Sequence, residues 1–466
     1  MIPRPNQLDV MERCRAAYRA GHRRVTMQCA TGFGKTICAA LVVQGARSRN
    51  HRVLFVTHRT EIHEQTLGKL ADVGLFPAEL TAGKQVPDAP LIAASIQTLA
   101  RRDVPPADLV IVDEAHCNHA QQLRLQEALP KAWFLMLTAT PARLDGKPLP
   151  ADVIVSGPTV VQLQAAGNLC PTVLYGVASP DVSKVPISNG DYAKGPLELA
   201  ARRPHLVGAV PDNYRRYLGG RRTLLFASGV KHSLECRDAL VMAGIRAVHV
   251  DGTTPPLQRQ RAWADLRAHS IDVVCSIGVA IEGLDLPEVD GIYWARPTTS
   301  LTVYMQGNGR GMRSAPGKRD LVIVDAAGNW ARHGLPETEH EWSLTGKPKR
   351  ASIGSLSTCK ECLAVYPASP VCPRCGAVAQ AVERQGPRTI GGELVKITAA
   401  ELERRARASS RLIPVRPCPS WAASDAGLWN ALENKRFLEG YALGDGSRGS
   451  PGWTASMWRR RHRIRT

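Results

Sequence analysis

A glycine-rich segment near the N-terminus has the residue types needed to hold a phosphate group. It is Ala30-Thr31-Gly32-Phe33-Gly34-Lys35-Thr36, placed between an apolar run and a second apolar stretch from Ile37. Glycines let the backbone curl so that its N–H groups face phosphate oxygens at the positive end of the following helix. We expect Lys35 to hold the β- and γ-phosphates of a nucleotide and Thr36 to bind Mg²⁺. The general pattern has a glycine where this chain has Cys29, so an ordinary glycine turn is the alternative.

Two neighbouring carboxylates follow another apolar run. Asp113-Glu114-Ala115-His116 comes directly after the run Leu109–Val112. A carboxylate at the carboxyl end of a parallel strand lies at the sheet edge that binds ligands, beside a phosphate loop. We expect Asp113 to hold Mg²⁺ through water and Glu114 to orient and deprotonate an attacking water molecule. An exposed acidic turn is the alternative.

Four of the twelve cysteines are clustered as two Cys-x₂-Cys pairs with nine residues between them: Cys359, Cys362, Cys372 and Cys375. Four thiolates at such spacing are typical of a closed tetrahedral Zn²⁺ site. Because no coordination position stays open, we expect a structural metal that this small module needs in order to fold. The other cysteines are scattered, which excludes a disulfide framework and suits a reducing compartment.

Composition indicates a globular protein with a polyanionic partner. The 466 residues are 44% hydrophobic and 22% charged, which excludes wholesale disorder. Lys and Arg number 60 against 41 Asp and Glu, a net charge of +19, and such an excess points to nucleic acid or to a solvated basic surface. No apolar run approaches the ~18 residues of a membrane-spanning helix, and no secretory signal is visible, so we expect no membrane partner.

Short runs rich in Val, Ile and Leu alternate with amphipathic stretches, which predicts a parallel α/β sheet. A segment rich in Pro and Gly at 145–158 divides the runs into two groups, so we expect two α/β domains in tandem. The runs expected to form strands are 24–30, 52–58, 91–95, 109–113 and 133–138, then 223–227, 246–250, 272–275, 291–295 and 320–324.

The chain resembles the superfamily 2 helicases and translocases of the DEAH-box branch, with most similarity to bacterial and phage XPB-like and type III restriction translocases. Beyond the two motifs above, matching segments occur in the order of that family: Arg4-Pro5-Asn6-Gln7, Phe55–Ile62, Ala94–Leu99, Thr138-Ala139-Thr140, Leu224–Ser228, Glu282–Pro287 and Gln306–Arg313. The resemblance covers residues 4–330 and implies two RecA-like domains that bind ATP between them.

The resemblance also implies roles for single residues. Arg4 and Gln7 occupy the element that reads adenine, with Gln7 in the place that contacts the base. Arg310 and Arg313 occupy the places that neutralise the γ-phosphate during hydrolysis, with Gln306 nearby; a planar guanidinium suits this task.

In the segment Glu282–Pro287, Gly283 and Asp285 fall at nucleotide-facing positions, with Asp285 near the ribose. Two departures are visible: Gly307 stands where the family often has Arg, and Ile277 stands where a hydroxyl is usual, with Ser276 beside it. The family also assigns a coupling role to the place of His116, for which a buried structural histidine is the alternative.

We therefore expect two tandem RecA-like domains at 1–150 and 151–335, a Cys₄ zinc module at 336–380 and a basic C-terminal segment at 381–466. The predicted cofactors are ATP, Mg²⁺ and Zn²⁺. The expected partner is nucleic acid, with DNA preferred over RNA, together with proteins of a replication or recombination complex.

The predicted function is an ATP-dependent DNA helicase or translocase in the cytoplasm of a bacterium or phage-infected cell, acting in replication, recombination or repair. Alternatives are a duplex translocase that separates no strands, an RNA helicase, and a zinc-dependent nucleic-acid binding protein with a vestigial ATP site.

Overall fold

The computed structural model describes residues 3–58, 60–80, 85–143, 147–177, 179–188, 190–278, 286–345, 349–350 and 356–378. The chain divides into two units, Met1–Ala381 and Val382–Thr466. The basic segment 381–466 lies outside the described residues, as do Gly283 and Asp285.

The first part of the chain forms a seven-stranded sheet in which every pairing is parallel. Across the sheet the strands are β3 (Ala78–Leu80), β4 (Leu91–Ser95), β2 (Val53–Thr57), β5 (Leu109–Val112), β6 (Trp133–Thr138), β1 (Arg24–Gln28) and β7 (Val153–Ser156). Every residue of β2 and β5 is buried, as expected for central strands of a parallel sheet with helices on both faces.

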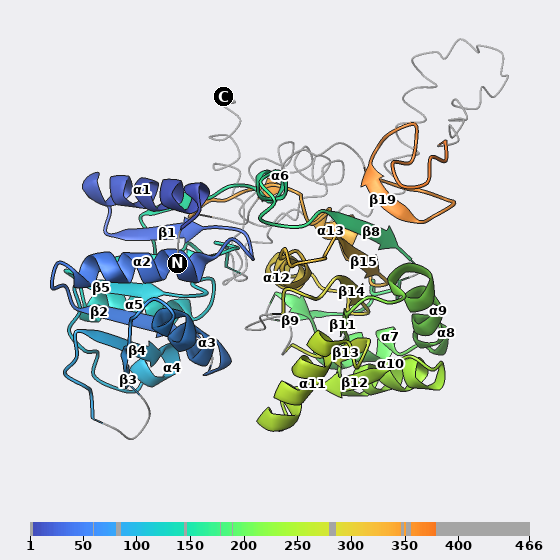
Figure 1. Ribbon diagram of the computed structural model, residues 1–466, viewed down its shortest axis with the longest axis horizontal. Helices are drawn as coiled ribbons and strands as arrows, with labels where there is room; N and C mark the ends of the chain where they lie inside the picture. The colour runs from blue at the N-terminus through green and yellow to red at the C-terminus, as the bar shows by residue number, and fades with distance from the viewer. Residues whose placement is uncertain are drawn as a thin grey trace, which may run out of the picture. The chain divides into compact units, whose positions relative to one another are not determined.

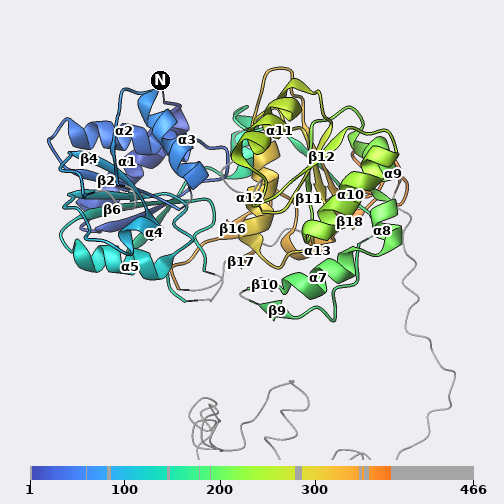
Figure 2. The ribbon, with the colours of Figure 1, turned by 90° about the horizontal axis from the view of Figure 1, so that it is seen from below.

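The helices of this domain lie on both faces of the sheet, with α1, α2 and α3 on one side and α4 and α5 on the other (Figure 2). They are α1 (Pro5–Arg19), α2 (Lys35–Arg47), α3 (Thr60–Ala71), α4 (Ile96–Leu99) and α5 (His119–Ala128). Helix α1 begins at a proline, whose missing N–H costs nothing in a first turn. It buries Gln7, Val10, Met11 and Cys14, which share one helical face.

The second sheet has eight strands (Figure 1). Six of them are parallel: β12 (Ala247–Val250), β13 (Val273–Ser276), β11 (Thr223–Phe226), β14 (Gly291–Trp294), β15 (Leu321–Asp325) and β8 (Thr172–Gly176). Two antiparallel strands, β19 (Ala364–Pro367) and β18 (Leu356–Thr358), extend the sheet beyond β8. Two small hairpins pair β9 (Ile187–Ser188) with β10 (Asp191–Tyr192) and β16 (His340–Glu341) with β17 (Lys349–Arg350).

The remaining helices join or cover these strands. They are α6 (Val160–Ala165), α7 (Lys194–Ala201), α8 (Pro204–Gly208), α9 (Val210–Asn213), a π-helical turn at Tyr214–Leu218, α10 (Val230–Met242), α11 (Pro256–Ala268), α12 (Leu301–Gly311) and α13 (Asn329–His333). Helix α12 begins at a Ser300 cap, whose side chain accepts a hydrogen bond from the Val303 N–H. This helix carries Arg310, and Arg313 lies just beyond its end; both are expected to reach the phosphates of ATP.

The expectation of two tandem RecA-like α/β domains is confirmed, and every strand expected from the sequence is present with ends that agree within two residues. Two strand pairings concern the predicted domain boundaries along the chain. Strand β7 pairs with β1, so the first sheet continues past residue 150. Strands β18 and β19 of the cysteine-rich segment belong to the second sheet. The four-part division of the chain stays a prediction.

The cysteine-rich segment packs closely on the second domain at Gly176. A Cβ at Gly176 would lie 2.8 Å from Nε1 of Trp330 and 3.1 Å from Cγ2 of Val365. Trp330 belongs to α13 and Val365 to β19, so this glycine lets three elements meet at the end of β8. The contact joins the cysteine-rich segment to the core of the domain.

We predict that Gly176→Ala destabilises the protein by about 1–3 kcal/mol, because the added methyl group overpacks this contact. Chemical denaturation followed by tryptophan fluorescence measures the change. Gly208→Ala is the matched control, since a Cβ there meets no atom within 4 Å and alanine favours the helix. Equal stability of the two variants would contradict the packing described here.

Candidate nucleotide site and metal centre

The glycine-rich segment forms the loop between β1 and α2. Gly32 and Gly34 have φ values of +88° and +94°, a left-handed conformation that favours glycine. Helix α2 begins at Lys35, so the free N–H groups of its first turn border the loop. The Lys35 ammonium donates a 3.1 Å hydrogen bond to the Cys29 carbonyl. The Cys29 side chain is fully buried and its carbonyl accepts the Lys35 hydrogen bond, so a cysteine is accommodated where the general pattern has glycine.

Arg4 and Gln7 lie beside this loop. The buried Gln7 side chain accepts a 2.9 Å hydrogen bond from the Arg4 N–H and donates one of 2.9 Å to the Phe33 carbonyl. A Cβ at Gly34 would lie 2.6 Å from Nε2 of Gln7. Nη1 of Arg4 is buried and has no hydrogen-bond partner among the described residues. Because an unpaired buried guanidinium nitrogen is costly, this atom fits a site that a ligand completes.

Asp113 and Glu114 stand at the carboxyl end of β5, at the same sheet edge as the phosphate loop. Burial, together with the charge of Glu114, raises the pKa of Asp113 to about 6. Burial acts in the same direction on Glu114, but the charges of His116, Lys35 and Arg310 outweigh it and hold the pKa of Glu114 below its ordinary value. Glu114 is therefore ionised, as a base must be, while Asp113 is a carboxylate that a metal cation would stabilise.

A hydrogen-bonded group links Glu114 to the second domain. The Gln306 amide on α12 donates to the Glu114 carboxylate at 3.4 Å and lies 3.2 Å from Nε2 of His116. The other ring nitrogen of His116 lies 3.1 Å from Oγ1 of Thr138 and 3.3 Å from Glu114. The histidine therefore contacts groups of both domains.

Helix α12 lies against the phosphate loop at Gly309, which has no side chain to keep the two apart. A Cβ at Gly309 would overlap Thr31. Arg310 is buried and interacts electrostatically with Glu114. Cγ of Arg313 lies 3.3 Å from the position that a Cβ at Gly32 would take. Arg310 therefore lies near Glu114 and Arg313 near the phosphate loop, and their roles toward the γ-phosphate stay predictions.

Two further glycines allow α12 to pack closely on the sheet of its own domain. A Cβ at Gly307 would lie 2.6 Å from the ring of Trp294, and one at Gly311 would overlap Leu321. The Trp294 indole also donates a 2.8 Å hydrogen bond to the side-chain carbonyl of Asn308. The departure at Gly307 therefore has a structural reason, since Trp294 fills the space where the family often has an arginine.

The sequence analysis did not single out Asn118. This residue has a φ of +54° and begins α5, and its side-chain amide bonds the His58 ring. Gln97 donates a 2.8 Å hydrogen bond to the His58 carbonyl. His58 and Gln97 lie in the family-matching segments Phe55–Ile62 and Ala94–Leu99, which are thus connected to the turn that carries the carboxylates. An asparagine two residues after His116, at the start of a helix, was the available sequence signal.

The four clustered cysteines converge as a metal site would require. The Sγ atoms of Cys359 and Cys375 are 3.7 Å apart, those of Cys362 and Cys372 are also 3.7 Å apart, and all four lie within 4.8 Å of one another. Tetrahedral Zn²⁺ with bonds of about 2.3 Å would place its sulfurs about 3.8 Å apart. All four are free thiols in this arrangement. The donors and their spacing fit zinc.

Comparisons with known proteins agree with this architecture. Residues 1–143 match the family model described as the res subunit of type III restriction enzymes, and residues 209–315 match the helicase conserved C-terminal domain. The "51.5 kDa protein" of Lactococcus phage (isolate 7-9) is 32% identical over 362 residues, which are 75% of this chain and 77% of that protein. The chain therefore belongs to the superfamily 2 helicases of the restriction-translocase type, which are nucleic-acid-dependent ATPases.

More distant relatives are also helicases or restriction-enzyme subunits. The "Putative ATP-dependent helicase IRC3" of Saccharomyces cerevisiae is 26% identical over 70% of this chain, which spans only 52% of that protein. A putative HsdR subunit fragment of a type I restriction enzyme from Vibrio vulnificus shares the fold, with a TM-score of 0.57 and 19% identity over 75% of this chain and 70% of that one. In the described part of the chain, no helix is both long and apolar enough to span a membrane.

We predict that Lys35→Ala and Glu114→Gln each lower ATP turnover at least about 100-fold while leaving the fold intact. The first removes the phosphate-binding cation, and the second removes the base but keeps the shape of the side chain. Steady-state phosphate release measures turnover, and circular dichroism checks folding.

Lys131→Ala and Glu127→Gln are matched controls on exposed side chains of the same domain. Normal hydrolysis by both site variants would refute the assignment of the site.

Proposed function

We propose that this protein is an ATP-dependent DNA motor in which ATP binds between the two domains and its hydrolysis drives movement along nucleic acid. One observation carries the proposal: α12 of the second domain lies against the phosphate loop and bonds Glu114 of the first domain. A ligand in that loop must therefore change the contacts between the domains. Such coupling converts a chemical step into domain movement.

The proposed chemistry follows from the positions of the side chains. Lys35 leaves the Cys29 carbonyl to bind the β- and γ-phosphates, and Glu114 takes the proton of the attacking water. Thr36 and Asp113 hold Mg²⁺, which neutralises phosphate charge when bound. Arg310 and Arg313 balance the charge that develops on the γ-phosphate.

The remaining nucleotide contacts are proposed by position. Arg4 and Gln7 bind the adenine end, with Thr31 to Gly34 around the phosphates and Gln306 at Glu114. Gly283 and Asp285 are proposed as nucleotide-binding residues, with Asp285 near the ribose.

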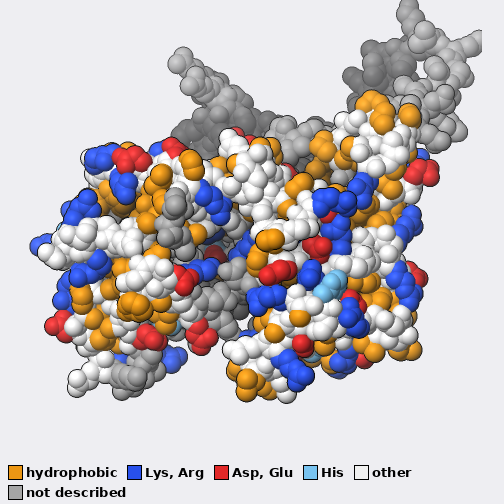
Figure 3. Space-filling view, in the orientation of Figure 1, with side chains coloured by type: hydrophobic (Ala, Val, Ile, Leu, Met, Phe, Trp, Pro, Cys, Tyr) orange, Lys and Arg blue, Asp and Glu red, His pale blue; other side chains and the backbone are white. Residues whose placement is uncertain are grey.

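DNA is the proposed track. Lys and Arg side chains are scattered over the face shown in Figure 3, among fewer acidic ones, in keeping with the net charge of +19. One structural neighbour, with a TM-score of 0.50 and 16% identity, is a Type ISP restriction-modification enzyme bound to DNA. We further propose a cytoplasmic location and partner proteins of a replication or recombination complex.

We predict that DNA stimulates ATP hydrolysis about tenfold, in the range typical of coupling between two sites. Hydrolysis by the full chain is measured with single-stranded, duplex and forked DNA, with single-stranded RNA and without nucleic acid, using Lys35→Ala as the blank. If RNA stimulates hydrolysis more strongly than DNA, the track is RNA and the proposal of DNA is wrong. Absence of hydrolysis under all conditions would favour the binding protein with a vestigial ATP site.

A duplex translocase that separates no strands is the second candidate. It is favoured by the match of residues 1–143 to the res subunit of type III restriction enzymes. Release of the labelled strand from a forked duplex identifies a helicase. Displacement of a triplex-forming strand without fork opening identifies a translocase.

We propose that the four cysteines bind one structural Zn²⁺ ion that holds the cysteine-rich segment on the second sheet. Strand β19 pairs with β8, and Arg374 of the second cysteine pair donates a 3.0 Å hydrogen bond to the hydroxyl of Tyr175. The metal site therefore stands next to the sheet of the motor domain.

We predict one zinc per chain by elemental analysis. Removal of the metal with a chelator lowers the melting temperature by about 5 °C or more, because the edge of the sheet loses its cover. The double variant Cys359→Ser/Cys372→Ser reproduces this loss, whereas Cys117→Ser keeps its zinc. A melting temperature that does not respond to loss of zinc would contradict a structural role.

A further inference from the structure

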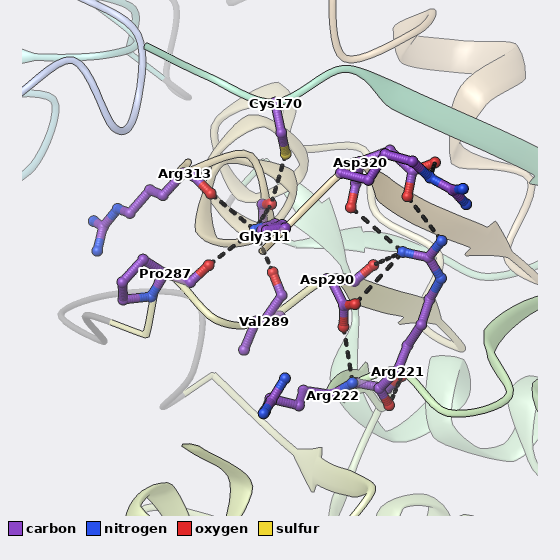
Figure 4. Close-up of polar contacts among 12 residues, drawn as sticks. Cys170, Arg221, Arg222, Pro287, Val289, Asp290, Gly311, Arg313 and Asp320 are labelled. Carbon is purple, nitrogen blue, oxygen red and sulfur yellow. Dashed lines mark hydrogen bonds and ion pairs between the residues drawn. The ribbon is translucent and has the colours of Figure 1, made fainter. Parts of the chain in front are cut away.

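The ammonium group of Lys318 lies inside a ring of backbone carbonyl oxygens. It donates to the carbonyls of Pro287, Val289, Gly311 and Arg313 at 2.5–3.0 Å (Figure 4). An ammonium has only three N–H donors, so at least one of them is shared. Four converging carbonyls are the kind of environment that proteins build around a bound cation, and here the cation is tethered to the chain.

These carbonyls come from two segments that are distant in sequence. Pro287 and Val289 belong to the turn before β14, and Pro287 ends the segment Glu282–Pro287 that matches the helicase family. Gly311 is the last residue of α12, and Arg313 lies two residues after it. Lys318 therefore joins the turn at 287–289, where the segment Glu282–Pro287 ends, to the carboxyl end of α12, which carries most of the segment Gln306–Arg313.

The same place receives support from the segment that connects the domains. The Cys170 N–H donates a 2.9 Å hydrogen bond to the Met312 carbonyl, and Leu169 forms a β-bridge with Arg313. The Ser314 hydroxyl donates to the Gly167 carbonyl at 3.1 Å. The backbone of Arg313 is thus held on both sides, while its side chain lies against the phosphate loop at Gly32.

A second ionic group fixes the strand ends behind the ring. Arg221 bonds the Asp320 carboxylate at 2.7 Å and lies 3.6 Å from that of Asp290, which also accepts a 2.8 Å hydrogen bond from the Arg222 N–H (Figure 4). Asp290 and Asp320 directly precede β14 and β15. The turn held by Lys318 is therefore attached to the amino ends of two central strands of the sheet.

Loss of the ammonium would have a direct physical consequence. Four partly buried carbonyls would then lose the ammonium as their donor, and the Cys170 thiol at 3.5 Å would still donate to that of Gly311. Each unmade hydrogen bond of a buried group costs free energy. The two segments are expected to separate, and Arg313 moves with them. A shift of about 1 Å in a catalytic group is enough to cost about 100-fold in rate.

We propose that Lys318 is a positioning residue for ATP hydrolysis, which acts as a tethered cation that holds the turn at 287–289 and the Arg313 backbone together. The proposal rests on the proposed function, since it assumes that Arg313 faces the γ-phosphate. It assigns to Lys318 a role that none of the sequence motifs includes.

The first test is a double-mutant cycle for DNA-stimulated ATP hydrolysis. We expect Lys318→Ala to lower kcat about 10- to 100-fold with little change in KM for ATP. If Lys318 acts through Arg313, the variant Lys318→Ala/Arg313→Ala is no slower than Arg313→Ala alone. Additive losses, or a change confined to KM, would overturn the proposal.

The second test restores the missing cation. Propylammonium has the three carbons and the nitrogen that Lys318→Ala removes, so we expect it to raise kcat of that variant several-fold and leave the wild type unchanged. Tetramethylammonium at equal concentration controls for ionic strength, since it has no N–H donor. Equal effects of the two salts would overturn the tethered-cation role.

Lys231→Ala is the matched control, because it removes the same side chain from an exposed position at the start of α10 in the same domain. Melting temperatures are measured for all variants, and rates are compared well below them. A wild-type protein without ATP hydrolysis would refute the proposed function. An active wild type with an equally active Lys318→Ala would refute only the inference about Lys318.

Discussion

The site depends on the close approach of α12 to the phosphate loop of the other domain. Gly307 and Gly311, one turn apart, allow the helix to lie on Trp294 and Leu321 of its own domain, while Gly309 on the other side meets Thr31. Each glycine inside a helix costs about 0.5–1 kcal/mol relative to alanine. That cost is accepted because glycines on two faces of α12 let the helix pack closely on both sides. The close packing brings Arg310 near Glu114. Bulkier residues at these positions would hold the phosphate loop and the arginines apart.

The charges at this contact explain why the site suits a magnesium nucleotide. Asp113 and Glu114 lie side by side, and burial of Asp113, together with the charge of Glu114, raises the pKa of Asp113. Lys35 rests on a neutral carbonyl, and Nη1 of Arg4 has no partner among the described residues. A cation beside Asp113 and a phosphate beside Lys35 would satisfy both groups. Packing of α12 and hydrogen bonds such as that from Gln306 to Glu114 hold the side chains in position before a ligand binds, as preorganised sites require.

Sequence reasoning found the parts of the molecule that local patterns encode. Runs such as 91–95 and 133–138 are long and apolar enough to be recognised as buried strands, and both are present with those ends. Strands β3 and β18 have three residues each, too few for a pattern. The pairing of β19 with β8 joins segments far apart in the chain, and local sequence patterns do not predict such a pairing. The spacing of the cysteines predicted their cluster, whereas the contact of Trp294 with Gly307 required the fold.

The second domain supports α12 from several directions. Tyr304 in the middle of the helix stacks on His333 of α13, and its hydroxyl donates a 3.0 Å hydrogen bond to the Gly334 carbonyl. Trp330 of the same short helix meets Gly176 at the end of β8, where the cysteine-rich segment joins the sheet. Asp325 accepts the Trp330 N–H at 2.7 Å and so fixes α13 to β15. Packed elements of this kind move as units, because interiors at crystal-like density deform little. Any shift of α12 on binding ATP must therefore move the cysteine-rich segment with it, unless the contact at Gly176 breaks.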